Sequence, residues 1–371
     1  NDDGVIETEG SEAHGIIAKS HVGTIDGFSE STAGAVIVSN NSGSVTVIGS
    51  QSSAIVALSR SEIGAASDVT IDNAEGALLA FGGVSGYAVD AGSFSATGDS
   101  GLVSLDNTGG SIVGHSVDGA VLLQSLAADD HTSGGITVTS SGAVAGTGSL
   151  SYGMRLVSGT GNISLTNTGL SQGGTGGHAV SMEGGTSNLL NNSGSGEIFT
   201  LGGLSDVVIT GGAASEAIVN EAGGWMMGSI DLDYGFLDGT GNTIENRSGA
   251  TYIAGTEIDL GHDTDNSNLF TNAGVLSIGL AGDPNGNLQL EPTTFVTTAT
   301  PEPASPSLFA FFASPAEFEP TLDNLQLTTV TGNFSQSAGG VTIADIAFDR
   351  NDQGVPGDDE MDRMFVTGLA S

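Results

Sequence analysis

Short apolar segments alternate with clusters of Gly, Asn and Ser along most of the chain. One phrase recurs: a β-branched segment, then Asn or Ser, a small residue and Gly, then a second apolar segment. Examples are VIVSNNSGSVTVIG (36–49) and VSLDNTGGSIVG (103–114). Runs of about four to eight residues rich in Val, Ile and Thr between turn residues are typical of β-strands. No stretch combines a 3.6-residue period with helix caps, so we expect an all-β protein.

The phrase returns at a nearly regular interval of 25–34 residues. Its polar anchor falls at Asn40, Asn73, Asn107, Ser140, Asn167, Asn192, Asn220, Asn246 and Asn272. A further apolar segment precedes most anchors, as in GAVLLQS (119–125) and YGMRLVS (152–158). Each unit therefore holds about three short strands. Strands at this period without helices between them predict the coils of a parallel β-solenoid.

The physics of one coil accounts for its residue types. Each strand pairs with its equivalent in the next coil, about 4.8 Å away, so that inward Val, Ile, Leu and Ala stack on their own equivalents. We expect the recurring Asn to lie at one corner and to form hydrogen bonds with the residues above and below it. About nine to eleven coils would then make a rod about 50 Å long.

The pattern changes after about residue 281. All eight prolines lie between Pro284 and Pro356, and PEPASPSLFAFFASPAEFEP (301–320) is excluded from a regular ladder because Pro lacks a backbone donor. We expect its phenyl rings to pack on the rod or cap it, with a partner-contact surface as the alternative. The chain is thus divided into β-helix coils over 1–281, a Pro/Phe-rich loop insertion over 282–321 and a C-terminal β-helix segment over 322–371.

Composition and charge narrow the classes of partner. The chain carries 43 Asp and Glu against 6 Lys and Arg, a net charge of −37, and this field repels phosphate, so we expect no nucleic-acid partner. With no Cys there is neither a disulfide framework nor a thiolate metal site. No run of 18 apolar residues occurs, so we expect no membrane-spanning helix. The first residues, NDDGVIETEG, do not form a signal peptide, which implies a removed leader or a piece of a longer protein.

Both ends of the chain resemble the passenger domains of bacterial autotransporters. GVIETEGSEAHGIIAKSHVG (4–23) is similar to passenger repeats, although HVGTIDGF departs from the Gly-Gly-rich loop that usually follows. GNFSQSAGGVTIADIAFDR (332–350) with DEMDRMFVTGLAS (359–371) is similar to the C-terminal part of such passengers. The matching positions there are Gly332, Phe334, Gln336, Gly339, Gly340, Ile343, Asp349, Asp362, Arg363, Phe365, Val366, Gly368 and Ala370.

This resemblance implies a right-handed parallel β-helix that is exported through the outer membrane and displayed on, or shed from, a bacterial cell surface. It also implies a C-terminal segment that folds early and templates the growth of further coils. The family's C-terminal membrane barrel has no counterpart in these residues, so we expect a cleaved or excerpted passenger. The lack of Cys fits this route, because a disulfide would hinder threading through a narrow pore.

We therefore expect an extracellular, non-enzymatic rod that acts in adhesion or in surface or matrix structure. Its partner would be a receptor or glycan on a host, a surface or a neighbouring cell. One alternative is a self-assembling filament or surface-layer subunit, formed by self-association. The other is a secreted polysaccharide-active β-helix enzyme, which would bring three or more carboxylates together in a groove.

Two kinds of motif suggest catalysis only weakly. GDSG (98–101) matches the nucleophile loop of chymotrypsin-like proteases, but His14 and His21 lack the context of a catalytic base, so we expect no role for Ser100 as a nucleophile. DDH (129–131) and GHD (261–263) resemble acid clusters of β-helical polysaccharide hydrolases, but solvated loop residues are the favoured interpretation. The sequence thus predicts no catalytic residue.

The candidate metal site is the acidic loop DRNDQGVPGDDEMD (349–362). Its carboxylates suit Ca²⁺, although their spacing is not that of an EF-hand, and general cation screening is the alternative. A smaller oxygen-rich set lies in GHDTDNSN (261–268). Ca²⁺ is the one candidate cofactor, with the ligands Asp349, Asp352, Asp358, Asp359 and Asp362. Trp225 with the two methionines after it is predicted to pack in the core of one coil.

Overall fold

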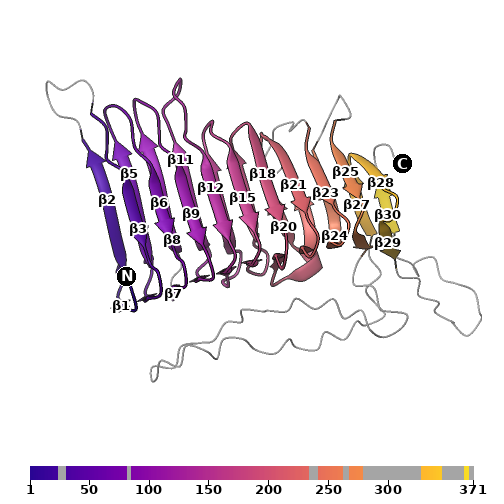
Figure 1. Cartoon of the computed structure of the whole chain (residues 1–371), viewed down its shortest axis with the longest axis horizontal. Coiled ribbons are helices and arrows are strands. Elements are labelled where there is room, and N and C mark those ends of the chain that lie inside the picture. Colours follow the sequence, from indigo (N-terminus) through magenta and orange to yellow (C-terminus); the bar gives the residue numbers. More distant parts are fainter. Residues whose placement is uncertain are drawn as a thin grey trace, which may run out of the picture.

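The computed structural model describes residues 1–23, 31–81, 85–233, 241–261, 267–278, 327–344 and 363–366. These residues form a parallel β-helix whose strands follow one another in chain order along the long axis of the molecule (Figure 1). Every strand pairing in the described residues is parallel and joins equivalent strands of successive coils. The predicted solenoid is confirmed, with three strands in a typical coil.

The strands stack into three ladders, and the described residues contain eleven coils. The first ladder consists of β1 (Val5–Glu9), β4 (Ser44–Ile48), β7 (Ala77–Phe81), β10 (Ser111–His115), β13 (Ala143–Gly146), β16 (Leu170–Gly173), β19 (Glu197–Thr200), the first halves of β22 (Trp225–Asp231) and β24 (Thr251–Asp259), β26 (Val275–Ile278) and β29 (Val341–Ala344).

The second ladder shares β22 and β24 with the first, because these two long strands run around the corner between them. It consists of β2 (Ile16–Val22), β5 (Ile55–Ser61), β8 (Tyr87–Ser95), β11 (Gly119–Leu126), β14 (Tyr152–Ser158), β17 (Val180–Gly184), β20 (Val207–Thr210), the second halves of β22 and β24, β27 (Leu327–Thr331) and β30 (Arg363–Val366).

The third ladder forms a separate sheet with one strand per coil. It consists of β3 (Val36–Ser39), β6 (Val69–Asp72), β9 (Val103–Asn107), β12 (Ile136–Ser140), β15 (Ile163–Asn167), β18 (Ser187–Asn192), β21 (Ser215–Asn220), β23 (Thr243–Asn246), β25 (Leu269–Asn272) and β28 (Asn333–Gln336).

Helical structure in the described residues is limited to one short 3₁₀ turn, η1 (Gly203–Ser205). No helix among them is long and apolar enough to cross a lipid bilayer. β1, β2 and β3, which form the first coil, pair on one side only within these residues.

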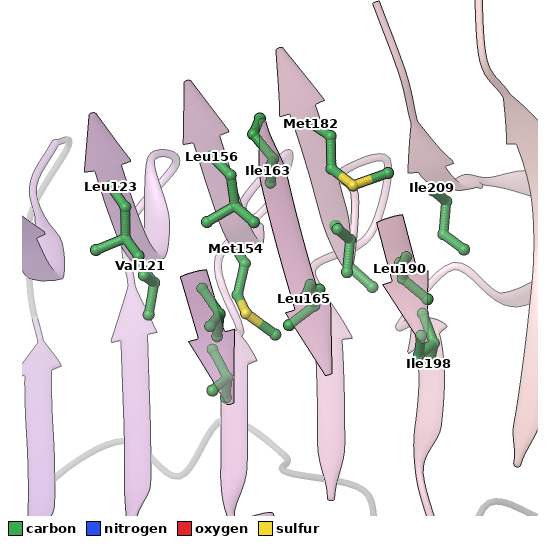
Figure 2. Close-up of a cluster of buried hydrophobic side chains, with 14 of the residues drawn as sticks. Val121, Leu123, Met154, Leu156, Ile163, Leu165, Met182, Leu190, Ile198 and Ile209 are labelled. Atoms are coloured by element: carbon green, nitrogen blue, oxygen red, sulfur yellow. The ribbon is translucent and has the colours of Figure 1, made fainter. Parts of the chain in front are cut away.

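The interior is a single stack of aliphatic side chains, as alternation along each strand requires. Figure 2 shows Val121 and Leu123 of β11 beside Met154 and Leu156 of β14, and Met182 of β17 beyond them, all fully buried. Burial of each such side chain contributes about 1.5–3 kcal/mol relative to exposure. The stack runs the length of the described coils. Toward its C-terminal end it contains three aromatic rings, Tyr252, Phe270 and Phe334, with centroids 6.0 and 5.3 Å apart.

The predicted Asn anchors form a hydrogen-bonded ladder at the end of the third-ladder strands. Asn40 donates from Nδ2 to Asn73 Oδ1 at 2.8 Å, and the same bond recurs from Asn73 to Asn107 and along the later anchors. The earlier Asn anchors also cap the following turn, as when Asn40 Nδ2 donates to Gly43 O. The later ones donate instead to a backbone carbonyl of the next coil, as when Asn220 Nδ2 donates to Thr251 O. These Asn side chains are 0–1% exposed, so their mutual hydrogen bonds replace the hydrogen bonds to water that burial removes. We name this column the Asn ladder.

The Asn ladder is longer than predicted at both ends and weaker at one rung. Asn1 donates to Asn40 Oδ1 at 3.0 Å, and Asn272 donates to Gln336 Oε1 at 3.0 Å. At Ser140 the shorter side chain accepts from Asn107 at 3.3 Å, and Asn167 Oδ1 is buried without a hydrogen-bond partner.

A second buried polar column lies at the start of the later third-ladder strands. Val and Ile occupy this position in the early coils, but Asn188, Glu216, Asn242 and Asn268 occupy it from β18 onward. Glu216 is fully buried; its Oε1 accepts from Gly212 N at 3.0 Å and from Asn188 Nδ2 at 3.4 Å. Burial raises the pKa of Glu216 to about 8, so this side chain is mostly neutral at pH 7 and fits among amides.

The sequence predicted that Trp225 packs in the core of a coil, and this prediction is wrong. Trp225 lies outside the interior. In β22 the alternation turns Met226 inward, where it is fully buried, and turns Trp225 and Met227 to the outer face of the first ladder. There Trp225 contacts Phe199 edge-on, with ring centroids 5.8 Å apart. This outer apolar cluster also contains Val113, Ala145, Leu170 and Ile253.

Candidate functional site

Rare residue types gather on the outer side of the second ladder. Arg155 on β14 forms a two-point ion pair with Glu183 on β17, with Nε–Oε1 at 2.7 Å and Nη2–Oε2 at 3.0 Å. The Arg155 guanidinium also lies 5.6 Å from the centroid of the Tyr152 ring. The Tyr152 ring in turn lies 5.3 Å from that of His178, tilted by 49°. With Tyr87, these residues form what we call the Arg155 cluster.

The coil geometry explains how these side chains meet. Met154 and Leu156 point inward, so Arg155 between them points outward, and its side chain reaches across β11 to form a hydrogen bond with Tyr87. Gly119 stands in register between Tyr87 and Tyr152 and adds no side chain there. Arg155 therefore joins coils that are not adjacent in the stack.

In the Arg155 cluster, the positive charge of Arg155 is paired with the carboxylate of Glu183. The hydrogen bonds that Arg155 donates to the Glu183 carboxylate raise the pKa of Arg155 above its already high ordinary value. Burial raises the pKa of Tyr87 to about 12, although its hydrogen bond with Arg155 opposes the shift. Arg155 therefore stays charged and Tyr87 stays neutral at neutral pH. Together with the half-exposed rings of Tyr152 and His178, they suit a contact surface for a polar or sugar-like ligand rather than proton transfer.

A group of carboxylates lies further along the same outer face. Asp231 on β22 and Asp259 on β24 are in register on adjacent strands, and Glu257 precedes Asp259 by two residues. Burial raises the pKa of Asp231, and proximity to Asp259 adds to the shift; the pKa of Glu257 is raised by its partial burial and by the same two aspartates. Within the described residues, however, no three His, Asp or Glu side chains come together in an arrangement that could hold a metal ion.

The GDSG motif is part of a structural serine corner. Ser100 is 5% exposed, and its hydroxyl bonds to that of Ser125 at 3.0 Å, which itself donates to Gly101 O. Its neighbour Asp99 does pair with His131 at 3.5 Å, but the pKa of Asp99 is lowered mainly by the backbone N–H of Thr132. The Ser100 hydroxyl is thus engaged with another serine in the described residues.

The remaining candidates divide between surface loops and undescribed residues. Asp129 and His131 of the DDH motif are exposed, as expected for solvated loop residues. Gly261 is described, but the rest of the GHD motif is not. The predicted Ca²⁺ ligands Asp349, Asp352, Asp358, Asp359 and Asp362 all lie outside the described residues.

Sequence reasoning missed the Arg155 cluster and the carboxylates around Asp231. Arg155 and Glu183 lie 28 residues apart and meet only through the register of β14 and β17. The one available signal was rarity, since Arg155 is among 6 basic residues in a chain of 371.

No protein-family model, curated protein or solved structure compared with the chain gives a match. The role of these surfaces therefore rests on their geometry.

Proposed function

We propose that this chain is an extracellular, non-enzymatic β-helix rod, displayed on or shed from a bacterial surface, that acts in adhesion or in surface structure. The observation that carries the proposal is the uninterrupted stack of coils with one shared core and the Asn ladder along its corner. A stack of this kind is long in one direction and presents its outer faces far from an anchored end.

Three further features support display on a cell surface. Two of the residues that carry the resemblance to autotransporter passengers have structural roles in the β-helix. Phe334 packs against Phe270 in the core, and Gln336 extends the Asn ladder. The charge of −37 favours solubility, and the absence of Cys suits threading through a pore. The Arg155 cluster supplies a polar and aromatic contact surface on the side of the rod.

Surface labelling tests the proposal directly. Antibodies raised against the purified chain should label intact cells of the source bacterium, or the chain should be found in the medium. Brief protease treatment of intact cells should remove the label while a periplasmic marker survives. Labelling that requires permeabilised cells would contradict display. For adhesion, deletion of the coding sequence should reduce attachment, and a Tyr152→Ala, Arg155→Gln variant should restore it less well than the wild-type chain.

The carboxylates around Asp231 favour one second candidate, a polysaccharide-active enzyme. Neighbouring carboxylates with raised pKa values provide the acid and base that glycoside hydrolysis requires. Incubation of the chain with a panel of polysaccharides would then release reducing ends, and Asp259→Asn would abolish the release. Equal, background-level release of reducing ends by the wild-type and variant chains would reject the enzymatic function. The proposal of a non-enzymatic rod would then stand alone.

A further inference from the structure

A cavity of about 310 Å³ lies where three strands of the second ladder end. It is formed at the C-terminal ends of β5, β8 and β11, and its lining comes from Arg60, Ser61, Phe94, Ser95, Ala96, Leu126 and Ala127. The cavity is distant in the stack from the carboxylates of β22 and β24. Its volume is at the lower end of the range of about 300–1,000 Å³ that is usual for small-molecule sites.

Register between coils builds the walls of this cavity. Arg60 stands beside Phe94, and Phe94 beside Leu126, so three successive coils contribute a cation, an aromatic ring and an aliphatic chain. A Cβ at Gly92 would overlap the Phe94 ring, so the glycine gives that ring its position. The apolar wall is thus specified by residues of two neighbouring strands.

The serines of the lining are already engaged by the backbone. Ser61 Oγ donates to Ile63 O at 2.8 Å, and Ser95 Oγ donates to Gly64 O at 2.7 Å. They complete the turn and leave little hydrogen-bonding capacity for a ligand. Of the lining residues, only Arg60 carries a charged side chain.

Arg60 is exposed and has no ion-pair partner among the described residues. By contrast, Arg155 pairs with Glu183, and Arg247 pairs with Glu221 and Glu245. Within the part of the chain that the structure describes, Arg60 thus differs from the two arginines that carboxylates neutralise. A guanidinium offers a planar fork that fits one carboxylate, and the surrounding net charge of −37 disfavours ligands with several negative charges.

We propose that this cavity binds a small amphipathic monocarboxylate, with its carboxylate on Arg60 and its apolar body against Phe94, Leu126 and Ala127. The ligand class is that of a medium-chain fatty acid. Binding of this kind is separate from the display role, because it requires only the folded chain and one pocket on its side.

Calorimetric titration of the full chain with octanoate tests the proposal. Octanoate should bind saturably with one site per chain, and octanol, which has the same chain length without the charge, should bind at least about tenfold more weakly. Arg60→Gln should weaken octanoate by a similar factor and leave octanol unchanged. Phe94→Ala should weaken both ligands. Arg247→Gln removes an equal charge from a distant ion pair and should leave octanoate binding unchanged.

The outcomes separate cleanly. Absence of saturable octanoate binding at millimolar concentration would overturn the site. Equal affinity for octanoate and octanol, or an unchanged affinity in Arg60→Gln, would overturn carboxylate recognition. Circular dichroism melts of each variant establish that a lost affinity comes from a folded chain. None of these results depends on where the chain is located in the cell.

Discussion

Ser140 is a weak rung in an otherwise regular Asn ladder. Its hydroxyl accepts from Asn107 but is too short to supply the amide donor that the other anchors give to the next coil. Asn167 Oδ1 is consequently buried without a partner. A buried unsatisfied carbonyl of this kind costs about 1–3 kcal/mol.

Ser140→Asn should therefore stabilise the protein. The new Nδ2 would donate to Asn167 Oδ1, as the other anchors do, and raise the free energy of unfolding by about 1 kcal/mol. Urea unfolding followed by circular dichroism measures the change. The matched control is Asn220→Ser, which weakens an intact rung and should lower stability. If Ser140→Asn also lowered the stability, the explanation of the unpaired Asn167 Oδ1 would be contradicted.

Glu216 should make stability depend on pH. Burial raises its pKa in the folded state from an ordinary 4.5 to about 8, so the folded chain holds this proton more tightly than the unfolded chain does. The free energy of unfolding should then be highest below pH 4.5 and fall as the pH rises to about 8, by roughly 4–5 kcal/mol from this group.

The control for this prediction is Glu216→Gln, which keeps an acceptor for Gly212 N but does not titrate. Urea midpoints of both chains at pH 5 and pH 8.5 give the comparison. The wild-type chain should lose more stability between these values than the variant does. Parallel losses in the two chains would assign the pH dependence to other carboxylates.

The sequence predicted some of these residues and missed others for identifiable reasons. The nine anchors were found because they recur at a regular interval before Gly. Asn1 was missed because no strand precedes it, and Gln336 because it is not Asn. Glu216 carried a usable signal: it is two residues from Ile218 and four from Asn220, which places it on the inward face of β21. The sequence pattern gave no prediction for Glu216, because only the anchor at the end of each strand marks the repeat.

At the scale of elements, the corner between the first and second ladders depends on close backbone approach. Gly114 and Gly146 are in register, and Gly173 follows in the next coil. A Cβ at Gly146 would overlap the carbonyl oxygen of Tyr152, and one at Gly114 would overlap that of Gly119. Because these obstacles are backbone atoms, a side chain at the corner forces the two strands apart.

Gly146→Ala should accordingly destabilise the protein by about 1–3 kcal/mol, as overpacking does in other cores. Differential scanning fluorimetry should show a lower melting temperature. Gly34→Ala is the control, because the nearest atom to a Cβ there is Ser20 Oγ at an ordinary 3.4 Å. Its stability should stay within about 0.5 kcal/mol of the wild-type chain. Equal effects of the two substitutions would contradict the corner argument.

Three strands per coil were predictable because turn residues separate them in the sequence. The long strands β22 and β24 were not, since their course around a corner depends on a register shift after Gly228. The outer apolar cluster was missed for a related reason. Trp225, Met226 and Met227 read as one apolar run, and only the alternation of a strand divides them between two faces.

At the scale of the whole molecule, the net charge of −37 works against the compact state. Raising NaCl from about 10 mM to 500 mM should screen this repulsion and raise the melting temperature by roughly 5 °C. KCl should act equally, because the effect is not ion-specific. A further rise with micromolar Ca²⁺, abolished by Asp358→Asn, would instead establish the metal site predicted in 349–362.

Fold and surface chemistry differ in how far the sequence specifies them. A sequence repeat predicts a solenoid because every coil needs apolar residues at the same inward positions. The Arg155 cluster and the cavity beside Arg60 depend on neighbours in other coils, and the register sets which side chains meet. Sequence distance carries no direct information about such outer columns.

The separate coils also make the protein modular. Each coil touches little beyond its two neighbours, and the Asn ladder repeats the same bond at each step. The unit from Asn220 to Asn246 spans 26 residues, and a duplicate inserted after it would find a matching rung on both sides. Such proteins can lengthen or shorten by whole units through gene duplication or deletion, so the reach of the molecule is adjustable without redesign of its core.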